Sequence, residues 1–567
     1  MMASPTKSDA IADLHPKDPL VTVGNTLSED SSTSETEKPE PRSLRFWITI
    51  ASLSLLAFIC ALDATIITTP LPTIVEEIGG ETLYVWIANS FVIAATVVQP
   101  LWGQLANILG RKIPILTCLV LFMLGSGLAG GSKGPGMFIA GRSIQGAGAG
   151  GVYVLIDIVC CDLVALRDRG KYLGFINAGA GVASALGPVL GGAFGRGSWP
   201  WIFYINLPIC AVPLVTIFFV MRMKTGVVDI QSASWLGKVR QLDIPGNFIF
   251  IPSMISLLFG LVTGGVDYPW SSWRVILPLI LGGVGWIGFH VQQHFATNPM
   301  VPERLFSSRT SAAAYALTFL SSVAAQTALF FIPIYLQAIV GANVLLSGVY
   351  FLPSAIGILI AAGVAGVILS KTGVYKVLHW TAFGLSSLGF GLFTLLNTGT
   401  PAVAWVFYQL FAAAGSGIPI STMLPAIMAA LPESDVASAT SIFSFTKTFG
   451  YIWGVTIPSI IFNAVFNDNL FRIGDDVVES QLRNGGAYAF ASHAHTTRQS
   501  LDPLTWMRIQ NVYITSLKAV WWFGLALSLV GVLVVFIEKN IELRTDLQTE
   551  FGLDDGVDDL GAKAEKL

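Results

Sequence analysis

The sequence is poor in charge for its length. Asp, Glu, Lys and Arg make up only 12% of its 567 residues, whereas 53% of the residues are hydrophobic. Because a water-soluble domain usually carries about 25% charged residues, this shortage excludes an ordinary soluble protein. It predicts an all-α polytopic membrane protein that lies in the lipid bilayer. The net charge of −3 is small, so we expect no nucleic-acid partner.

Groups that carry chemistry are also scarce. The five cysteines (Cys60, Cys118, Cys160, Cys161 and Cys210) all fall in apolar runs, which excludes a disulfide framework in water-exposed loops. The chain has no Gly-rich loop that ends in Lys-Ser or Lys-Thr, the pattern that holds the phosphates of ATP. Its six histidines are too few for the several His boxes of a membrane di-iron enzyme. We therefore expect neither an enzyme nor a metal or organic cofactor.

Long apolar runs are what the sequence has instead. The hydrocarbon core of a bilayer, about 30 Å thick, requires about 20 apolar residues in helical form. Fourteen segments meet this requirement: 46–69, 84–106, 113–131, 137–161, 172–194, 200–221, 244–264, 274–295, 311–338, 346–369, 377–396, 402–430, 436–465 and 512–537. An even number of spans places both termini on one side. Lys and Arg are more frequent in the loops of that side, which predicts cytosolic termini.

A faint repeat divides these segments. Gly103–Lys112 follows the second segment and Gly366–Lys376 follows the tenth, and each stretch has two glycines seven residues apart. Because eight segments separate them, we predict a 6 + 2 + 6 arrangement with a central site between two six-helix halves. The predicted domains are a disordered cytosolic tail (1–44), an N-terminal six-helix bundle (45–222), two inserted helices with linkers (223–300), a C-terminal six-helix bundle (301–540) with an outer loop (466–511), and a cytosolic tail (541–567). The outer loop is either a small lid or a plain linker.

One carboxylate stands inside the first apolar run. Asp63 lies about 27 Å along a helix from Arg45, and Arg142 lies about 30 Å along the fourth segment from Asp162, so both fall at a similar depth in the membrane. Since an unpaired charge is costly there, we hypothesise that Asp63 and Arg142 interact. Proton uptake by Asp63 would then weaken the pair and change which way a cavity opens. The alternative is a fixed salt bridge that never titrates.

Other polar groups also lie within the apolar segments. Gln145 is one helical turn from Arg142 and is expected to share its network. Asp157, about 7–8 Å inside the inner edge, is either a second proton site or the partner of a basic residue at the inner gate. The remaining polar side chains either line a substrate cavity or hydrogen-bond a neighbouring helix: Gln99, Asn177, Asn206, Gln326, Gln337 and Gln409.

The fifth segment contains a proline among glycines. Pro188 follows Gly187 and removes one helical hydrogen bond, which favours a bend. Gly191 and Gly192 allow a neighbouring helix to approach closely. This pattern predicts at least a kinked helix at a packed interface.

Four motifs resemble the fourteen-helix branch of the drug:proton antiporters in the major facilitator superfamily, and its fungal members in particular, over residues 45–540. The first-helix motif is matched by Leu62, Asp63, Thr65, Ile66, Leu71 and Pro72, with Pro70 where the family usually has Ala. The loop motif is matched by Gly103, Leu105, Ala106, Gly110, Arg111 and Lys112, and departs at Asn107 and Ile108, where the family has Asp and Arg. The fourth-helix motif is matched by Arg142, Gln145, Gly146 and Gly148, and the fifth-helix motif by Gly187, Pro188, Gly191 and Gly192. Lys447 stands where an Arg is usual.

The resemblance implies a major facilitator fold and a proton-coupled antiporter that exports small organic compounds. These are either xenobiotic drugs or a secondary metabolite or toxin of the cell, and the proton gradient takes the place of a cofactor. The loop from Gly103 to Lys112 is expected to latch the two halves at the inner gate. Asn107 there weakens a charge interaction or replaces it by a neutral hydrogen bond. The fifth-helix motif marks antiport.

Two alternatives remain open. The first is a proton-coupled importer of a sugar, an amino acid or an iron chelate, against which the fifth-helix motif argues. The second is a receptor that transports nothing, which would keep its function when Asp63 is neutralised. We expect a monomer in the plasma membrane, with a vacuolar or vesicle membrane as the alternative.

Overall fold

The computed structural model describes most of the chain between residues 43 and 552. The described ranges are 43–67, 70–79, 83–223, 237, 240–265, 268–483, 485–498, 501–547 and 551–552, apart from the surroundings of Pro72, Tyr84, Val85, Ala185, Pro188, Val189, Gly195, Arg196, Val344 and Thr496. The predicted N-terminal tail up to residue 42, the linker at 224–236 and 238–239, and residues 548–550 and 553–567 of the predicted C-terminal tail lie outside them.

The regular elements in the described ranges are helices. The first group is α1 (Leu44–Ile66), α2 (Leu71–Ile78), α3 (Tyr84–Val97), α4 (Gln99–Leu109), α5 (Lys112–Gly130), α6 (Pro135–Leu163), α7 (Leu166–Gly197), α8 (Trp201–Tyr204) and α9 (Asn206–Val220). The second is α11 (Ile244–Thr263), α12 (Trp273–Phe295), η2 (Glu303–Phe306), α13 (Arg309–Ala338), α14 (Val344–Thr372), α15 (Tyr375–Phe393), α16 (Ala402–Met428), η3 (Glu433–Asp435), α17 (Val436–Asn469), η4 (Leu470–Arg472), α18 (Asp476–Leu482), α19 (Gly486–Thr497) and α20 (Pro503–Val535).

Eleven helices in the described ranges are long and apolar enough to cross a membrane, or twelve if the pair α3 and α4 is one bent span. That pair bends by 41° next to Pro100, which lies in the first turn of α4 and cannot continue the hydrogen bonding of α3. All fourteen predicted segments coincide with a helix or a broken helix. Two of the fourteen segments form helices that are not among the twelve candidate spans, namely α7, with 32 residues, and α15, with 19 residues. Fourteen spans therefore stay a prediction.

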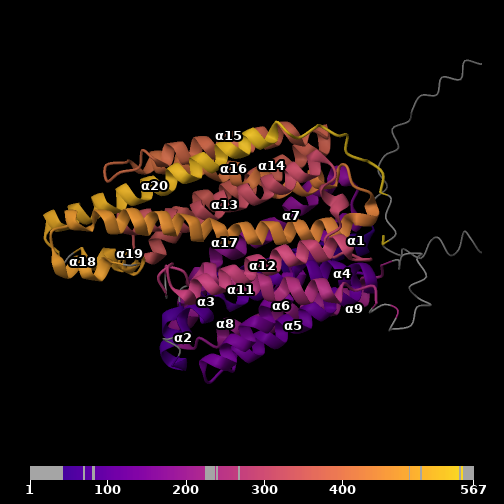
Figure 1. The fold of residues 1–567 in the computed structure, drawn as a ribbon, viewed down its shortest axis with the longest axis horizontal. Helices are drawn as coiled ribbons and strands as arrows, with labels where there is room; N and C mark the ends of the chain where they lie inside the picture. Colours follow the sequence, from indigo (N-terminus) through magenta and orange to yellow (C-terminus); the bar gives the residue numbers. More distant parts are fainter. Residues whose placement is uncertain are drawn as a thin grey trace, which may run out of the picture. The chain divides into compact units, whose positions relative to one another are not determined.

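Two groups of helices pack among themselves. In the N-terminal bundle α1 packs on α7, and α6 on both α3 and α5; in the C-terminal bundle α16 packs on α14 and α15, and α13 on α17. Both described ends of the chain, the start of α1 and the end of α20, lie at one end of the helices, which we call the proximal end (Figure 1). α18 and α19 lie at the opposite, distal end (Figure 1).

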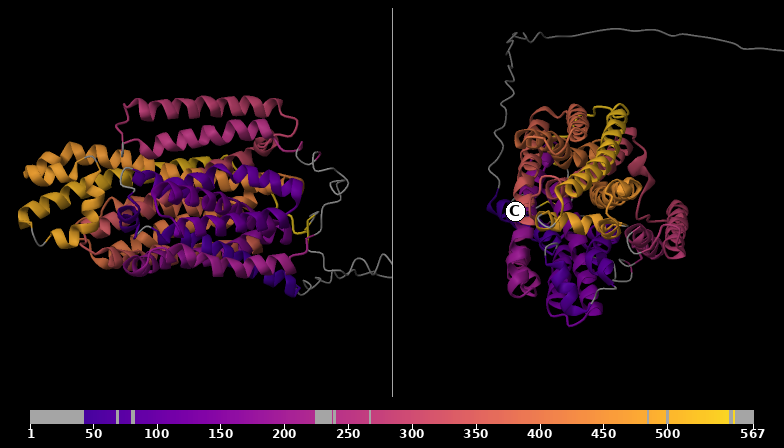
Figure 2. Two further views of the ribbon diagram at one scale, coloured as in Figure 1. Left: turned by 90° about the horizontal axis from the view of Figure 1, so that it is seen from below. Right: turned by 90° about the vertical axis from the view of Figure 1, so that its left-hand side faces the viewer.

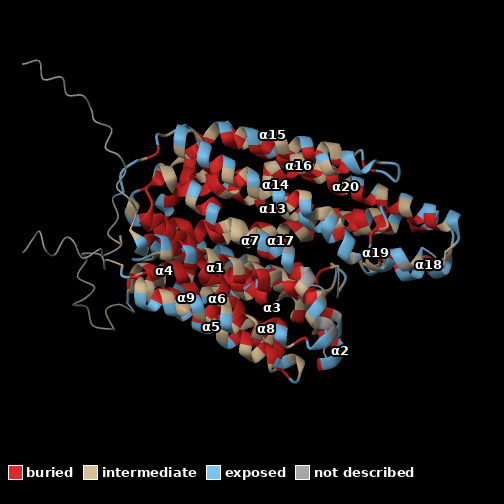
Figure 3. Ribbon diagram, turned by 180° about the vertical axis from the view of Figure 1, so that it is seen from behind, coloured by how far each residue is buried: buried red, intermediate tan, exposed pale blue. Residues whose placement is uncertain are grey.

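Glycines bring the helices of the N-terminal bundle together. A Cβ added to Gly148 of α6 would lie 2.6 Å from the carbonyl oxygen of Cys118 in α5, and one added to Gly146 would overlap the backbone of Phe91 in α3. In a membrane this packing matters, because lipid chains are as apolar as the side chains and give little hydrophobic drive to helix association. Buried residues accordingly lie between the helices and exposed ones along their outer faces (Figure 3).

α11 and α12 form a hairpin that the chain order inserts between the two bundles. The hairpin lies along one flank of the helices as a separate layer (Figure 2). α11 contacts α3 and α17; Asn247 of α11 donates a hydrogen bond of 2.8 Å to Gln104 of α4, and Phe250 packs on Phe445 of α17. The hairpin is thus attached to helices of both bundles.

The predicted outer loop is folded. Between α17 and α20 it forms η4, α18 and α19, and α19 packs on α13. Tyr488 of α19 stacks against Phe462 at 5.2 Å between ring centroids, and the hydroxyl of Tyr513 donates to the carbonyl oxygen of Ala487. The segment is therefore a small helical subdomain on the distal end of the C-terminal bundle rather than a plain linker.

The repeated glycine stretches occupy matching positions. Gly110 ends α4 and Gly373 ends α14, each with a positive φ, +78° and +70°, which a residue with a side chain rarely adopts. The first glycine of each stretch touches the opposite bundle: Gly103 faces Ser441 of α17, and Gly366 faces the backbone of Gly170 in α7. The two bundles therefore meet through two similar contacts, α4 with α17 and α14 with α7.

The glycine packing predicts a difference between two alanine substitutions. Gly148→Ala places a methyl group against the backbone of α5, so the melting temperature of the purified protein should fall by several degrees. Gly127→Ala, in α5, is the matched control because nothing lies within 4 Å of its added Cβ; removing a helix glycine there should leave stability unchanged or raise it by about 0.5–1 kcal/mol. Equal melting temperatures for the two variants would contradict the packing described.

Candidate functional site

Asp63 is the centre of a buried polar network in the N-terminal bundle. Its Oδ2 accepts a hydrogen bond of 2.7 Å from Arg142 Nη1, which forms an ion pair. Its Oδ1 accepts 2.7 Å bonds from Gln145 Nε2 and from Asn206 Nδ2. Ser126 Oγ of α5 accepts further bonds from both amides. Every oxygen of the carboxylate is therefore held by a donor of the same bundle.

Arg142 is held through Nη1, whereas its buried Nε has no hydrogen-bond partner among the described residues. Besides Asp63, its Nη1 donates to Gln145 Oε1 at 2.6 Å, and its guanidinium lies 4.3 Å from the ring centroid of Phe91. Asp63 is 0% exposed and Arg142 is 1% exposed. The aromatic face stabilises the cation where water is absent.

The location of this network bears on whether Asp63 and Arg142 form a proton-dependent switch or a fixed salt bridge. Its members come from α1, α5, α6 and α9, which all belong to the N-terminal bundle. Since Asp63 has no exposed surface, a proton can reach it only when the packing around α1 or α6 changes. In the conformation described, the pair is a closed salt bridge. Asn206 and Ser126 were not assigned to the network from the sequence, and Ser126 lies between two glycines of an apolar run, which carries little signal.

α7, which carries the fifth-helix motif, borders this network. Gly187 of α7 leaves no room for a Cβ beside Thr65, and Gly191 leaves none beside the carbonyl oxygen of Ile66. Both contacts are with α1, within one turn of Asp63. Gly192 is half-buried, and Pro188 lies within α7 with its side chain outside the described part. The glycines therefore seat α7 directly against the segment of α1 that follows the carboxylate.

The predicted inner-gate loop lies at the proximal end. Arg111 forms a 2.7 Å ion pair with Asp162 at the end of α6, and each side chain is only 3% exposed. Arg111 also donates to Asn107 Oδ1 at 3.3 Å. Asn107 in turn donates to Ser438 Oγ in the first turn of α17, at 3.4 Å. A neutral hydrogen bond thus connects the loop to the C-terminal bundle, where the family has an Asp. Lys112 bonds within the N-terminal bundle: it donates a 2.7 Å hydrogen bond to the carbonyl oxygen of Phe218 in α9.

Charged groups that the sequence did not single out complete the contact at this end. Arg169 of α7 pairs with Glu433 of η3 at 2.8 Å and also donates to Met428 Sδ. Arg167 donates to the carbonyl oxygens of Ser370 and Lys371 at the end of α14. Each bond joins the N-terminal to the C-terminal bundle, so we call this set the proximal clamp.

The beginning of the predicted C-terminal tail lies against the proximal clamp. The carbonyl oxygen of Arg544 accepts a hydrogen bond from the backbone N–H of Arg167. The guanidinium of Arg544 lies 3.3 Å from the carboxylate of Glu433. Further on, the ring of Phe551 lies 3.7 Å from the guanidinium of Arg111. Upstream, Glu538 lies 2.8 Å from the buried Nδ1 of His379 in α15, within hydrogen-bonding distance. The segment therefore contacts both bundles at the proximal end.

A second pair strengthens the C-terminal side of this end. Arg304 of η2 donates to both carboxylate oxygens of Asp435, at 2.8 and 2.9 Å. This hydrogen bonding raises the pKa of Arg304, although desolvation lowers it. The guanidinium therefore stays charged, and it fixes the start of α17.

Asp157 lies apart from the Asp63 network. It is buried on the face of α6 that contacts α17, where Lys447 acts on it electrostatically and Ser444 lies nearby. Its basic neighbour is therefore a lysine of the opposite bundle and not a residue of the loop from Gly103 to Lys112.

The polar residues predicted to line a cavity are placed differently from one another. Gln99 is buried and accepts a 3.0 Å bond from Thr448 of α17. Gln409 is buried and ties α16 to α14 through Ser354. The other three are half-buried: Asn177 donates within α7, Gln337 donates to Ser347, and Gln326 faces Gly454 of α17. Gln409 thus has the helix-bridging role, and Gln99 lies where the bundles meet.

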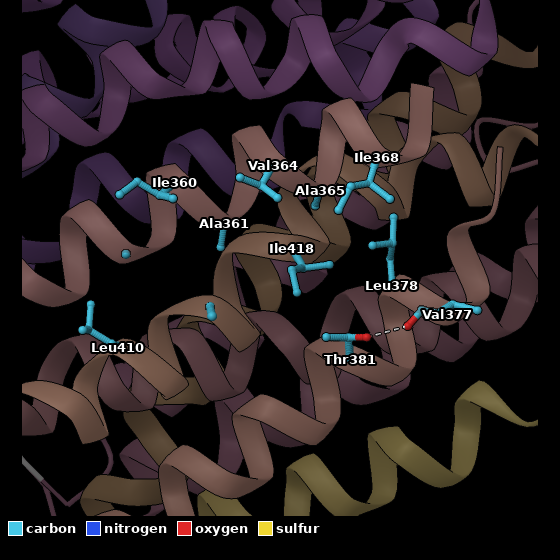
Figure 4. Close-up of a pocket in the computed structure, with 12 residues that line it drawn as sticks. Ile360, Ala361, Val364, Ala365, Ile368, Val377, Leu378, Thr381, Leu410 and Ile418 are labelled. Atoms are coloured by element: carbon cyan, nitrogen blue, oxygen red, sulfur yellow. Dashed lines mark hydrogen bonds between the residues drawn. The ribbon is translucent and has the colours of Figure 1, made fainter. Parts of the chain in front are cut away.

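A large groove lies elsewhere. It has a volume of about 610 Å³ and runs between α14, α15 and α16 (Figure 4). Its lining includes Ile360, Val364, Ile368 and Val377, and its one hydroxyl, on Thr381, bonds to the carbonyl oxygen of Val377. None of the polar residues expected at the substrate cavity lines it. Its exposed apolar residues are typical of a lipid-facing surface.

Comparison with protein families decides the identity of the fold. A family model described as Major Facilitator Superfamily matches residues 53–455. The chain belongs to the Major Facilitator Superfamily. Its bundles, inserted hairpin and central polar network are thus those of a superfamily member, and the predicted fold class is confirmed at this level.

Relatives in this superfamily are similar over nearly the whole chain. The "MFS efflux transporter aclA" of Aspergillus oryzae is 41% identical over 93% of this chain and 96% of its own length. "Efflux pump FUS6" of Gibberella fujikuroi is 39% identical over 92% of this chain and 95% of its own. The predicted resemblance to fungal efflux transporters is confirmed.

Solved structures show the same fold at low identity. The human organic anion transporter MFSD10 covers 87% of this chain with a TM-score of 0.55 and 15% identity, and its own chain is covered completely. The proton:xylose symporter XylE covers 88% of this chain with a TM-score of 0.55 and 13% identity, and 97% of its own chain is covered. At such identities the likeness concerns the fold alone.

The buried network predicts that two substitutions compensate each other. Arg142→Met leaves the Asp63 carboxylate buried without its cation, which typically costs about 3–5 kcal/mol. Adding Asp63→Asn removes the orphaned charge, so the double variant should recover most of the lost melting temperature of the purified protein. If the double variant is less stable than Arg142→Met alone, the two side chains do not form the ion pair that dominates this network.

The proximal clamp predicts how accessible a buried position becomes. Ser441 of α17 is 1% exposed against Gly103, so Ser441→Cys reports opening of this end by its rate of reaction with a soluble maleimide. Arg169→Met, which breaks the pair with Glu433, should raise that rate several-fold. Lys112→Met is the control, because Lys112 bonds within the N-terminal bundle. The native cysteines are all buried and give a low background. Equal rates for both variants would show that the Arg169 pair does not hold the bundles together.

Proposed function

We propose that this chain is a proton-coupled antiporter that exports small organic compounds and takes up protons in return. The relatives are named as efflux transporters over almost their full length, which supports the direction of transport. The observation that carries the proton coupling is the buried Asp63–Arg142 ion pair. It is a titratable carboxylate in the membrane interior whose charge state is balanced by one cation.

The mechanism follows from where the bundles touch. The clamp joins them at the proximal end, which we assign to the cytosol, so the conformation described is closed to the cytosol. When Asp63 takes a proton, the ion pair is lost and Arg142 keeps only a weaker hydrogen bond to a neutral carboxyl group. The α1 segment against Gly187 and Gly191 is then free to shift, which changes the equilibrium between cavities open to one side and to the other.

The proposed membrane arrangement is fourteen spans in a 6 + 2 + 6 order. α7 and α15 complete the number when added to the twelve candidate spans, and α11 with α12 forms the inserted pair. Both termini then lie in the cytosol, and the helical subdomain with α18 and α19 lies outside. We assign the chain to the plasma membrane as a monomer, with xenobiotics or a secondary metabolite as substrates.

Neutralising one carboxylate tests the proton coupling. Asp63→Asn keeps the size of the side chain and its hydrogen bonding to Gln145 and Asn206, but it cannot take up or release a proton. In vesicles that contain the purified protein, an imposed pH gradient should drive uphill movement of an exported dye through the wild type and not through the variant. Exchange of labelled dye without a gradient should persist in both.

A carboxylate outside the membrane-spanning helices provides the matched control. Glu76 is exposed in α2, outside the long helices, so Glu76→Gln should transport like the wild type. Gradient-driven movement through Asp63→Asn at the wild-type rate would exclude Asp63 as the proton carrier and would favour the fixed salt bridge.

A further inference from the structure

Lys447 is a cation in the middle of a long helix. It follows Val436, the first residue of α17, by eleven residues, or about 16 Å of helix, which is close to the centre of a bilayer about 30 Å thick. A charged side chain at that depth is costly and is retained where it meets a partner or a water-filled cavity. Lys447 is only half-buried, and its ammonium lies 5.3 Å from the ring of Phe443.

The exposed part of Lys447 faces the space between the bundles. Two neighbours on the same side of α17 face the N-terminal bundle. Ser444 lies near Asp157 of α6, and Thr448 donates a hydrogen bond to Gln99 of α4. α17 also contacts both α4 and α6 directly, so this side of the C-terminal bundle faces the N-terminal bundle (Figure 1).

Asp157 acts as the resident counter-ion of Lys447. The carboxylate is 6% exposed, and the charge of Lys447 is what acts on it from α17. The two groups are not within the 4 Å of an ion pair among the described side chains, in contrast to Asp63 and Arg142. The titratable groups near Asp157 on its own helix are Tyr153, the thiols of Cys160 and Cys161, and Asp162. Lys447 is therefore neutralised at a distance, and the hydrogen-bonding capacity of its ammonium is not used by that carboxylate.

Two hydroxyls extend this site by one turn. Tyr153 lies four residues before Asp157 on α6, and Tyr451 lies four residues after Lys447 on α17, so each stands on the same helix face as its charged neighbour. Both are half-buried, and their phenols act on each other electrostatically. Nearby, Gln99 has a buried Nε2 without a hydrogen-bond partner among the described residues. The Tyr153 hydroxyl donates to the carbonyl oxygen of Cys60 at 3.3 Å. The ammonium of Lys447, the Tyr451 hydroxyl and the free amide N–H of Gln99 together are donors suited to an anionic group.

We propose that Lys447 binds the carboxylate, or a chemically similar acidic group, of the exported compound. This inference rests on the proposed export function and deepens it by naming amphipathic organic acids as the substrate class. In the empty site Asp157 neutralises Lys447. In the loaded site the acidic group of the substrate takes that place, with Tyr451 and the amide of Gln99 as further donors and the neighbouring aromatic rings against its apolar body.

A matched pair of fluorescent ligands tests this site. Dansylglycine carries a carboxylate, and dansylglycinamide has the same aromatic body with a neutral carboxamide. Binding is measured by dansyl fluorescence on the full chain in lipid nanodiscs, with empty nanodiscs as the blank. The wild type should bind dansylglycine at least tenfold more tightly than dansylglycinamide. Lys447→Met should abolish this preference, and Lys447→Arg should keep it.

Asp157→Asn separates an anion site from a structural ion pair. It removes the negative charge that competes with the ligand, so it should tighten dansylglycine binding several-fold and leave dansylglycinamide binding unchanged. If the pair were only structural, Asp157→Asn and Lys447→Met would weaken binding alike. Equal binding of both ligands by the wild type, no binding of dansylglycine, or an unchanged preference in Lys447→Met would each overturn the proposal.

The outcome is independent of the test of proton coupling. If gradient-driven transport persists in Asp63→Asn while the Lys447-dependent preference is found, the anion site stands and the coupling role of Asp63 is wrong. If Asp63→Asn loses gradient-driven transport while the preference is absent, the antiporter stands and the anion site is wrong.

Discussion

The buried ion pair between Asp63 and Arg142 is the interaction on which the N-terminal bundle depends. Removing two charges from water costs several kcal/mol per ion, and their mutual attraction repays this only when further hydrogen bonds satisfy the remaining atoms. The bundle supplies them through Gln145 of α6 itself and from two other helices, through Asn206 of α9 and Ser126 of α5. The positions of α1, α5, α6 and α9 are therefore coupled to one carboxylate. α7 packs on α1 within one turn of it, so a change in its charge acts on the helix that also contacts the opposite bundle.

The proximal clamp is built on a different principle. Its pairs, such as Arg169 with Glu433, lie at helix ends rather than in the middle of the membrane, and Glu433 remains partly exposed. Arg169 is fully buried in the closed contact, but water can reach both partners once the bundles separate, whereas the Asp63 network stays inside one bundle. A clamp of this kind suits a gate that must open in every transport cycle. The C-terminal segment around Arg544 joins it to a part of the chain that the motifs do not mention.

The two acidic groups of α6 and α1 differ in which surfaces they join. Asp63 is paired within one bundle and stays in the same surroundings while the bundles move as bodies. Asp157 faces Lys447 across the interface, so the distance between these charges changes whenever the bundles rock against each other. The first arrangement suits the storage of a proton, and the second suits recognition of a ligand that enters between the bundles. This division explains why one chain retains two charged pairs at a depth where each is costly.

The sequence by itself determined the class, the fourteen helical segments and the depth of the central charges, because apolar run length and helical rise translate directly into position along the membrane normal. It placed Asp63 and Arg142 at one level and identified Gly187 and Gly191 as packing residues. Only the tertiary structure decided what faces what around each helix. Apolar segments surrounded by lipid have little amphipathic pattern, so the sequence alone does not show that Gln409 bridges two helices, that Asp157 faces Lys447, or that Arg169 and Arg544 meet at Glu433. Those contacts depend on helix rotation and on pairs at least 55 residues apart in the sequence, which packing at glycine contacts sets.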